Sequence, residues 1–236
     1  MKDIFISSLV YLKAGLLALK YQKLLGEDFE TNFDITRELC QKVLEIAEIE
    51  VESFGMNNIH EKDALMIASN HNNFMDALVI LANSSRPISF VAKSEAFSYP
   101  FAKHFLTAID CISLNRKEMD AKKIMATQEK IANYLRNDRS LLIFPEGGTV
   151  KTDDIGEFKA ASLRAPKQVD SYILPTYIEG TNYIFKNGSK FLLNSGMKKV
   201  ILMYGNPFKP SELGLKMTRD IALYTRNQVL ELKMNK

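Results

Sequence analysis

A histidine and an aspartate five residues apart are the pair in this sequence best suited to moving a proton. His71 and Asp76 flank the dipeptide Asn72-Asn73. On a regular helix a spacing of five corresponds to about 140° of rotation, so the two side chains would diverge. They meet only if the backbone turns between them, which asparagine favours. The carboxylate would then reach one ring nitrogen and leave the other facing a cleft, as in an oriented general base.

A plainer interpretation of the same two residues also fits the sequence. Asp76 would cap the start of a helix, and His71 would hydrogen-bond a turn. A single histidine and a single aspartate at this spacing make a weak motif. The choice between the two interpretations therefore depends on what the rest of the chain brings to the same place.

Short apolar runs on either side predict the elements that would position the pair. Residues 65–68 are apolar and lie between Asp63 and Asn70, which is typical of a buried strand. Residues 77–81 form a second apolar run, which predicts the start of a helix. His71 would therefore follow the end of a strand directly.

Composition limits the classes of protein that this chain can form. With 236 residues and 46% hydrophobic residues, it fits one domain, with or without a small appendage. Cys40 and Cys111 show no CxxC spacing and no neighbouring histidines, so we expect a reducing compartment and no metal site. A net charge of +3 is too small to indicate nucleic acid as a partner, although it suits an anionic membrane surface.

The first 46 residues predict a helical membrane-docking segment that precedes a domain of residues 47–236. Residues 3–25 are mostly apolar and are interrupted by Lys13, Lys20 and Lys23, so no uncharged run reaches the ~18–20 residues of a spanning helix. The absence of a small-residue cleavage site argues against a signal peptide. The segment fits a helix lying in a membrane interface or an ordinary core helix. Asp34 is expected to cap a second helix that ends near Ile46.

Strand-like and helix-like segments alternate along the remaining sequence. This pattern predicts an α/β fold with a largely parallel central sheet flanked by helices, preceded by the N-terminal helical pair. In such sheets the ligand site lies beyond the carboxyl ends of the strands. A polar or charged residue follows each of four predicted strands, so we expect these residues at the same edge of the sheet, around one ligand site. They are His71, Lys93, Arg116 and Glu146. The predicted strands are residues 48–53, 65–68, 88–92, 110–114, 141–144, 172–174 and 200–204, and the later helices are residues 100–108, 118–136 and 217–234.

Four short blocks and one basic segment follow one another along the sequence. The first block has the form His-x4-Asp, and the third reads Phe-Pro-Glu-Gly. In chain order they are His71 to Asp76, Lys93-Ser94-Glu95, Ile112 to Arg116, Phe144 to Gly147, and Ile173 to Thr176. This ordered set, which covers about residues 50 to 205, resembles the glycerolipid acyltransferases, the family of the 1-acylglycerol-3-phosphate (lysophosphatidate) acyltransferases.

The resemblance implies an O-acyltransferase that makes phosphatidate. His71 would take the proton of a glycerol hydroxyl, and Asp76 would orient its ring. The hydroxyl would attack the thioester of acyl-CoA or acyl-carrier-protein directly, because no cysteine or serine stands like an activated nucleophile. No bound cofactor or metal is implied. The partners would be the acyl donor and membrane lipid, with no nucleic acid, at the cytoplasmic face of a membrane as a peripheral or monotopic protein.

The resemblance also implies residues that hold the acceptor. Lys93 and Arg116 would bind its phosphate, Arg116 with a bidentate fork and Lys93 as a point charge. Glu146 and Gly147 would shape the acceptor pocket, since a glycine allows the backbone to approach a ligand.

The third block departs from the family at the next two positions. Gly148 and Thr149 stand where the family usually has Thr or Ser followed by Arg. Lys151, Lys159 or Arg164 would have to replace that arginine, or the acceptor is another lysolipid, an aminolipid or a similar alcohol. A different class of protein, a non-catalytic membrane-binding module with the same fold, is the further alternative.

Overall fold

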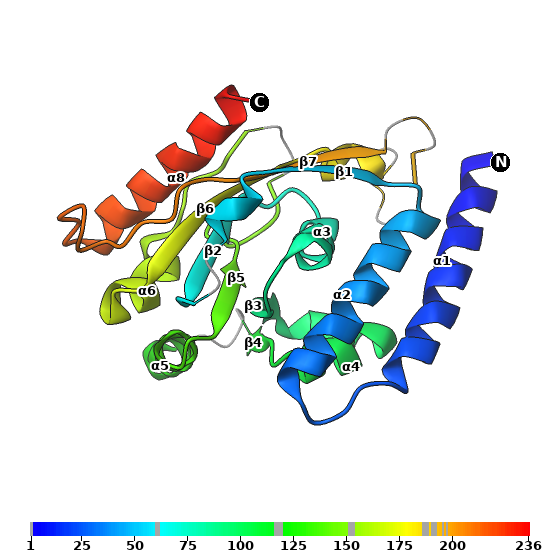
Figure 1. Cartoon of the computed structure of the whole chain (residues 1–236), viewed down its shortest axis with the longest axis horizontal. Coiled ribbons are helices and arrows are strands. Elements are labelled where there is room, and N and C mark those ends of the chain that lie inside the picture. Colours follow the sequence, from blue (N-terminus) through cyan, green and yellow to red (C-terminus); the bar gives the residue numbers. More distant parts are fainter. Residues whose placement is uncertain are drawn as a thin grey trace.

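A computed structural model describes residues 2–59, 62–115, 120–150, 154–185, 189, 193, 194, 196 and 198–236. Strands and helices alternate along most of the chain after two N-terminal helices (Figure 1). The helices are α1 (Lys2–Gln22), α2 (Phe29–Ile46), α3 (Met75–Asn83), α4 (Pro100–Ala108), α5 (Ala121–Arg136), α6 (Arg164–Val169), α7 (Thr181–Ile184) and α8 (Thr218–Met234). The strands are β1 (Glu50–Phe54), β2 (Leu65–Ser69), β3 (Ile88–Lys93), β4 (Ile112–Leu114), β5 (Ser140–Ile143), β6 (Tyr172–Glu179) and β7 (Lys199–Tyr204).

The described strands form one sheet in the order β1-β7-β6-β2-β5-β3-β4. Strands β6, β2, β5, β3 and β4 run parallel, whereas β7 is antiparallel to β6 and carries β1 parallel to itself at the edge. The carboxyl ends of five strands therefore reach the same edge of the sheet. The predicted α/β fold with a largely parallel sheet is confirmed.

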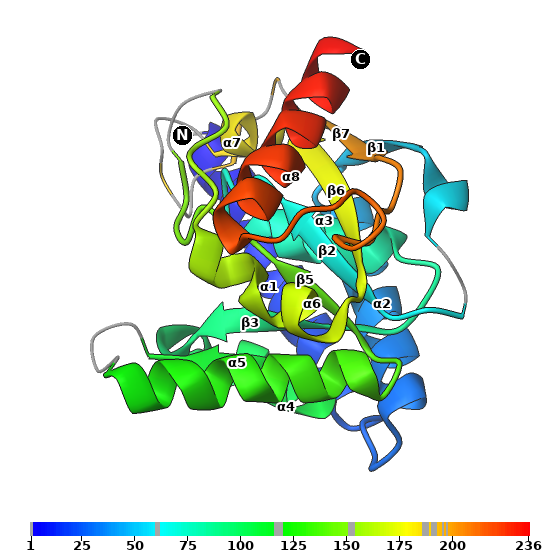
Figure 2. The ribbon, with the colours of Figure 1, turned by 90° about the vertical axis from the view of Figure 1, so that its left-hand side faces the viewer.

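Helices cover both faces of the sheet, so its central strands are buried on both sides. In β2, Leu65 and Ile67 enter one core, which α2 and α3 cover, while Met66 and Ala68 enter the other, which α5 and α8 cover. This alternation follows from the two-residue period of a strand. Figure 2 views the second face, with α5, α6 and α8 nearest the reader. A strand covered on both faces explains why residues 65–68 are continuously apolar.

Among the described residues, helix α1 packs mainly against α2 and α4. Ala18 and Tyr21 pack with Leu39 of α2 and Phe105 of α4 in a small apolar cluster. By length and composition α1 is apolar enough to cross a membrane, and 22% of its apolar window is buried. The helix that the sequence predicted over residues 3–25 is present but ends at Gln22. Four of its large apolar residues are each at least 60% exposed, namely Ile4, Phe5, Leu12 and Leu16.

Several details of the prediction were wrong. Asp34 does not cap the second helix, because α2 begins six residues earlier than expected and Asp28 is its cap, accepting the N–H of Thr31 at 2.7 Å. Sequence patterns also missed the short helices α6 and α7 and the reversed direction of β1 and β7. The proposed boundary between residues 46 and 47 stays a prediction, although Phe33 and Leu44 of α2 pack in the same core as β2.

Candidate active site

The histidine–aspartate pair lies directly after β2, at the edge where the parallel strands end. Between the strand and the pair, Asn70 makes two hydrogen bonds to the backbone of β6. Its Nδ2 donates to the carbonyl of Ile178 at 2.9 Å, and its Oδ1 accepts the N–H of Ile178 at 2.9 Å. Asn70 is buried, so these bonds satisfy its amide and fix the backbone from which His71 departs.

His71 and Asp76 are in direct contact. Nδ1 of His71 lies 2.8 Å from Oδ2 of Asp76. The same oxygen accepts the backbone N–H groups of Asn72 at 2.7 Å and Asn73 at 2.8 Å. Helix α3 starts at Met75, so the carboxylate stands in its first turn and closes the asparagine turn behind it. The turn that the spacing required is present, and the contact interpretation of Asp76 describes its geometry. The capping interpretation was wrong, because Phe74 is the N-cap of α3 and makes no side-chain capping hydrogen bond.

The contact determines what the imidazole can do. Asp76 is fully buried, and an ionised carboxylate only accepts hydrogen bonds. Nδ1 of a neutral His71 must therefore carry the proton, which leaves the lone pair on Nε2. The Phe144 ring stacks on the imidazole with centroids 4.0 Å apart and 17° between the planes, which restricts rotation of the ring. With its side chain 14% exposed, His71 remains accessible from outside.

Glu146 joins the turn after β5 to the turn after β2. Its Oε2 accepts the backbone N–H of His71 at 3.0 Å, and its Oε1 accepts that of Gly156 at 2.9 Å. Burial raises the pKa of Glu146 above its usual range, and the hydrogen bonds from Gly156 and His71 oppose that rise. Both oxygens are thus occupied by backbone groups, and Glu146 holds the backbone of His71 in position. Its predicted role in shaping an acceptor pocket stays a prediction.

Gly147 has a positive φ of +75°, in the left-handed region that favours glycine. A Cβ at this position would lie 2.6 Å from Nζ of Lys159, so the ammonium of Lys159 rests against the glycine. The backbone N–H of Lys159 donates to the carbonyl of Pro145 at 2.9 Å. Of the three cations considered as replacements for the family's arginine, Lys159 is therefore beside the third block. Lys151 lies outside the described residues.

The two predicted phosphate ligands differ in what can be said of them. Lys93 ends β3, and its side chain is exposed. Strand β3 pairs with β5 as far as Phe90 opposite Leu142, and Lys93 lies three residues beyond that pair, at the carboxyl end of β3. Arg116 lies outside the described residues, two positions after the end of β4. Lys93 thus reaches the same sheet edge as His71, two strands away, or about 10 Å across the sheet.

Sequence reasoning missed one residue that touches the pair. The Thr181 hydroxyl donates to Oδ1 of Asp76 at 2.5 Å, and both side chains are fully buried. Thr181 follows β6 at the same sheet edge as His71. Its position after a strand end was the available signal, but the sequence pattern ended β6 too early, near Leu174.

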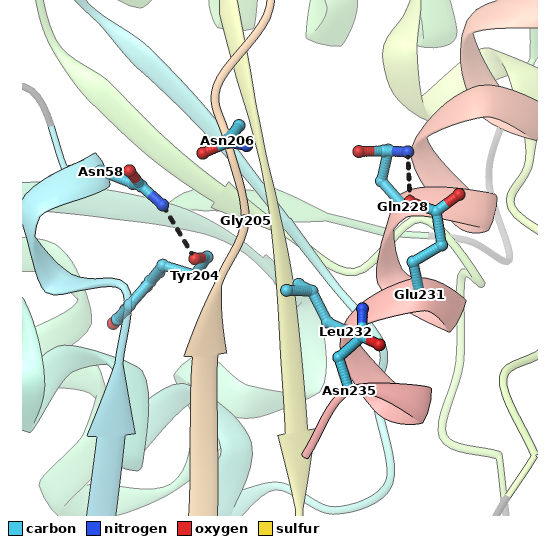
Figure 3. A pocket seen from close by; sticks show the side chains of 8 residues that line it. All are labelled: Asn58, Tyr204, Gly205, Asn206, Gln228, Glu231, Leu232 and Asn235. Atoms are coloured by element: carbon cyan, nitrogen blue, oxygen red, sulfur yellow. Dashed lines mark hydrogen bonds between the residues drawn. The ribbon is translucent and has the colours of Figure 1, made fainter.

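A separate hollow of about 230 Å³ lies between the end of β7 and the last turns of α8 (Figure 3). Amide side chains line it, including Asn58, which donates to the carbonyl of Tyr204 at 3.1 Å. None of the predicted site residues lines this hollow. Over the described ranges, no group of three or more His, Cys, Asp or Glu side chains is arranged to hold a metal ion.

Comparisons with known proteins identify the family of the chain. Residues 50–179 match the family model described as Acyltransferase. A 1-acyl-sn-glycerol-3-phosphate acyltransferase of Borreliella burgdorferi is 30% identical over 164 residues, which are 69% of this chain and 64% of that protein. A chloroplastic 1-acyl-sn-glycerol-3-phosphate acyltransferase of Arabidopsis thaliana is 26% identical over 149 residues, which are 63% of this chain and 41% of that protein. This chain spans less than two thirds of the length of either relative.

A solved structure shares the fold over nearly the whole chain. The crystal structure of the 1-acyl-sn-glycerophosphate acyltransferase PlsC from Thermotoga maritima superposes with a TM-score of 0.75 at 21% identity, covering 98% of this chain and 93% of that chain. The strand-end site and the family match together define an acyltransferase-type α/β protein. The chain belongs to the Acyltransferase family, and the resemblance found in the sequence is confirmed.

Proposed function

We propose that this chain transfers an acyl group from an acyl thioester to the free hydroxyl of a lysophospholipid. The preferred acceptor in this proposal is 1-acyl-glycerol-3-phosphate, and the product is phosphatidate. The observation that carries the proposal is the 2.8 Å contact between Nδ1 of His71 and the buried carboxylate of Asp76. In a member of the Acyltransferase family, that contact supports His71 as general base and Asp76 as the residue that orients it.

The proposed reaction needs no enzyme-bound intermediate. Nε2 of His71 takes the hydroxyl proton of the acceptor as the hydroxyl oxygen bonds to the thioester carbonyl carbon. The carbon–sulfur bond then breaks, and the leaving thiolate takes the proton back from the imidazolium. Asp76 stabilises the imidazolium while it exists.

The two cysteines support direct transfer. Both are buried, and burial raises the pKa of Cys40 to about 12 and the pKa of Cys111 well above its usual range. A thiol with a raised pKa provides almost no thiolate, which is the nucleophilic form. Neither cysteine therefore suits an acyl-enzyme mechanism.

The charge of the acceptor would be met by lysine and arginine. A phosphate brought to the strand ends needs cationic partners, because an unpaired desolvated charge is costly. Lys93 at the end of β3 and Lys159 against Gly147 stand on neighbouring strands and turns of the same edge. We propose that Lys159 takes the place of the family's missing arginine, and that Arg116 completes the phosphate site.

We also propose that α1 docks the protein on the cytoplasmic face of a membrane as a peripheral or monotopic protein. Ile4, Phe5, Leu12 and Leu16 are each at least 60% exposed, an arrangement that a core helix would not leave in water. Lysines interrupt this apolar surface, as in helices that lie in a membrane interface. Docking there would bring the sheet edge near its lipid acceptor.

One assay tests the proposed function and its rivals. The protein is incubated with labelled acyl-CoA or acyl-carrier-protein and with lysophosphatidate, lysophosphatidylcholine or a lyso-aminolipid, and products are read by lipid mass spectrometry. The proposal expects phosphatidate from lysophosphatidate, formed about 10²–10⁴-fold more slowly by the His71→Ala variant. Transfer to another acceptor alone would replace the proposed acceptor. Lack of thioester turnover with every acceptor would instead favour the non-catalytic membrane-binding module.

A further inference from the structure

The carboxylate of Asp76 has two oxygens with different partners. Oδ2 receives the imidazole of His71 and two backbone N–H groups of the asparagine turn. Among the described residues the hydrogen bond recorded at Oδ1 is the one from the Thr181 hydroxyl, at 2.5 Å. Both Asp76 and Thr181 are fully buried, so water does not replace this donor when it is lost.

The backbone holds Thr181 firmly in this place. The residue before it, Gly180, has a φ of +100°, and a Cβ there would lie 2.3 Å from the carbonyl oxygen of Lys199. Only glycine fits this turn, which directs the chain from β6 into α7 and brings Thr181 against Asp76. Two residues before Gly180, both backbone groups of Ile178 are hydrogen-bonded to the side chain of Asn70. The end of β6 is thus bonded to the segment after β2 just before the turn, and Thr181 just after the turn bonds Asp76 in α3.

We propose that Thr181 is a positioning residue for the acyl-transfer reaction, completing a His71–Asp76–Thr181 chain of hydrogen bonds. The inference rests on the proposed function. His71 positions the reacting proton, Asp76 holds His71, and Thr181 fixes the orientation of the carboxylate and shares its negative charge. Glu146 is the other carboxylate near the imidazole. It accepts the backbone N–H of His71 and makes no hydrogen bond to the carboxylate of Asp76 or to Thr181 among the bonds of the described residues.

Two substitutions separate the hydroxyl from the shape of the side chain. Thr181→Val keeps the branched shape and removes the donor, whereas Thr181→Ser keeps the donor and removes a methyl group. A positioning hydroxyl predicts that the valine variant loses about 10- to 100-fold in kcat with little change in KM, and that the serine variant stays near wild type. A residue that only fills space predicts the reverse order. Thr225→Val is the matched control, since Thr225 is fully buried and bonds the carbonyl of Ile221 in α8, away from the site.

The pH–rate profile gives a readout that packing alone would not move. Without the Thr181 donor, more negative charge remains facing the imidazole, so the proton is held there more tightly. The acid limb of kcat/KM should therefore move to higher pH in Thr181→Val and stay in place in Thr181→Ser and Thr225→Val. An acid limb that is the same in Thr181→Val as in the wild type would overturn the proposal.

A spectroscopic measurement keeps this test independent of the acceptor. NMR of ¹⁵N-histidine-labelled protein follows the Nδ1 proton of His71, which is identified by its loss in His71→Ala. The proposal expects that resonance to shift or broaden in Thr181→Val and to return in Thr181→Ser.

If the wild type made no phosphatidate while this pattern appeared, the proposed function would fail and the hydrogen-bond chain would stand. If the wild type made phosphatidate and Thr181→Val had the same kcat, the proposed function would stand and the positioning role of Thr181 would fail. Should Thr181→Val not fold, comparing Thr181→Ala with Thr181→Ser isolates the hydroxyl in the same way.

Discussion

Two charged groups lie at one edge of the sheet and are held in opposite ways: the Asp76 carboxylate after β2, and the Lys159 ammonium against the turn after β5. In the turn after β2, the Asp76 carboxylate is fully buried, and the hydrogen bonds at its two oxygens come from His71, the asparagine turn and Thr181. Beyond the turn after β5, the ammonium of Lys159 lies against Gly147 on a side chain that is exposed. The Asp76 carboxylate belongs to a fixed arrangement, whereas the Lys159 ammonium ends a long, solvated side chain.

This difference indicates a division of labour. A buried network costs little reorganisation at the moment of reaction, so it suits a group that must be in place before chemistry begins. An exposed lysine on a flexible stem adapts to the position of an anion and contributes to binding. Substitutions in the turn after β2 should therefore change kcat, and substitutions of the exposed cations should change KM.

The strongest test of this division replaces the imidazole itself. His71→Ala should lower kcat by about 10²–10⁴-fold, the usual loss of a general base, while the protein stays folded. Acyl transfer to lysophosphatidate measures this effect. His104→Ala is the matched control, because His104 lies exposed on α4 and should leave the rate unchanged. Equal rates for the two variants would end the case for His71 as base.

The exposed surface of α1 extends the comparison to contact with lipid. Replacing both Leu12 and Leu16 with Asp should weaken binding to anionic vesicles by about 10²-fold or more, since burying one leucine side chain contributes roughly 1.5–3 kcal/mol. Leu223→Asp serves as control, because this leucine is exposed on α8 to a similar extent, 57% against 60%. Vesicle co-sedimentation measures both. Unchanged binding of the double variant would mean that α1 does not dock on lipid.

How much of this arrangement the sequence predicts depends on how local the signal is. The five-residue spacing of His71 and Asp76 and the apolar run before it predict the contact, because both elements lie within a dozen residues. The contact of Thr181 with Asp76 joins residues 105 apart. No pattern around Thr181 indicates its partner, and only the pairing of β6 with β2 brings them together.

The same reasoning explains the errors in the fold. Alternating strands and helices predict a parallel sheet, and that holds for β2 to β6. Strands β1 and β7 run in the opposite direction, since β7 pairs antiparallel with β6 and β1 pairs parallel with β7. Pairing between separate strands sets this direction, and the local sequence pattern does not show it. For α2, both Asp28 and Asp34 have the residue type of a cap, so type alone does not choose between them. In the structure, the hydrogen bond from the N–H of Thr31 to the Asp28 carboxylate identifies Asp28 as the cap.

A smaller effect is expected from the exposed cation beside Gly147. Lys159→Ala should raise the KM for lysophosphatidate about tenfold and leave kcat nearly unchanged, since a phosphate remote from the reacting hydroxyl is bound similarly before and during reaction. Arg116→Ala should act in the same direction. Lys167→Ala, an exposed lysine on α6, is the control. A fall in kcat with unchanged KM would place Lys159 with the buried group and remove the division of labour.

The smallest expected effect comes from Glu146, the buried carboxylate that joins the two turns. Because burial raises its pKa, the folded protein binds a proton at Glu146 more readily than the unfolded chain does. The stability gained in this way is fully present below the usual glutamate range and is lost as pH rises through the raised pKa. Glutamine does not titrate, so Glu146→Gln lacks this dependence. The melting temperature of the wild type, relative to that of Glu146→Gln, should be higher at about pH 4 than at about pH 8. Glu157→Gln, at an exposed glutamate nearby, should show no such trend. A difference that grew with rising pH would mean that the hydrogen bonds from His71 and Gly156 outweigh burial, and that the junction between the turns is held best by the ionised carboxylate.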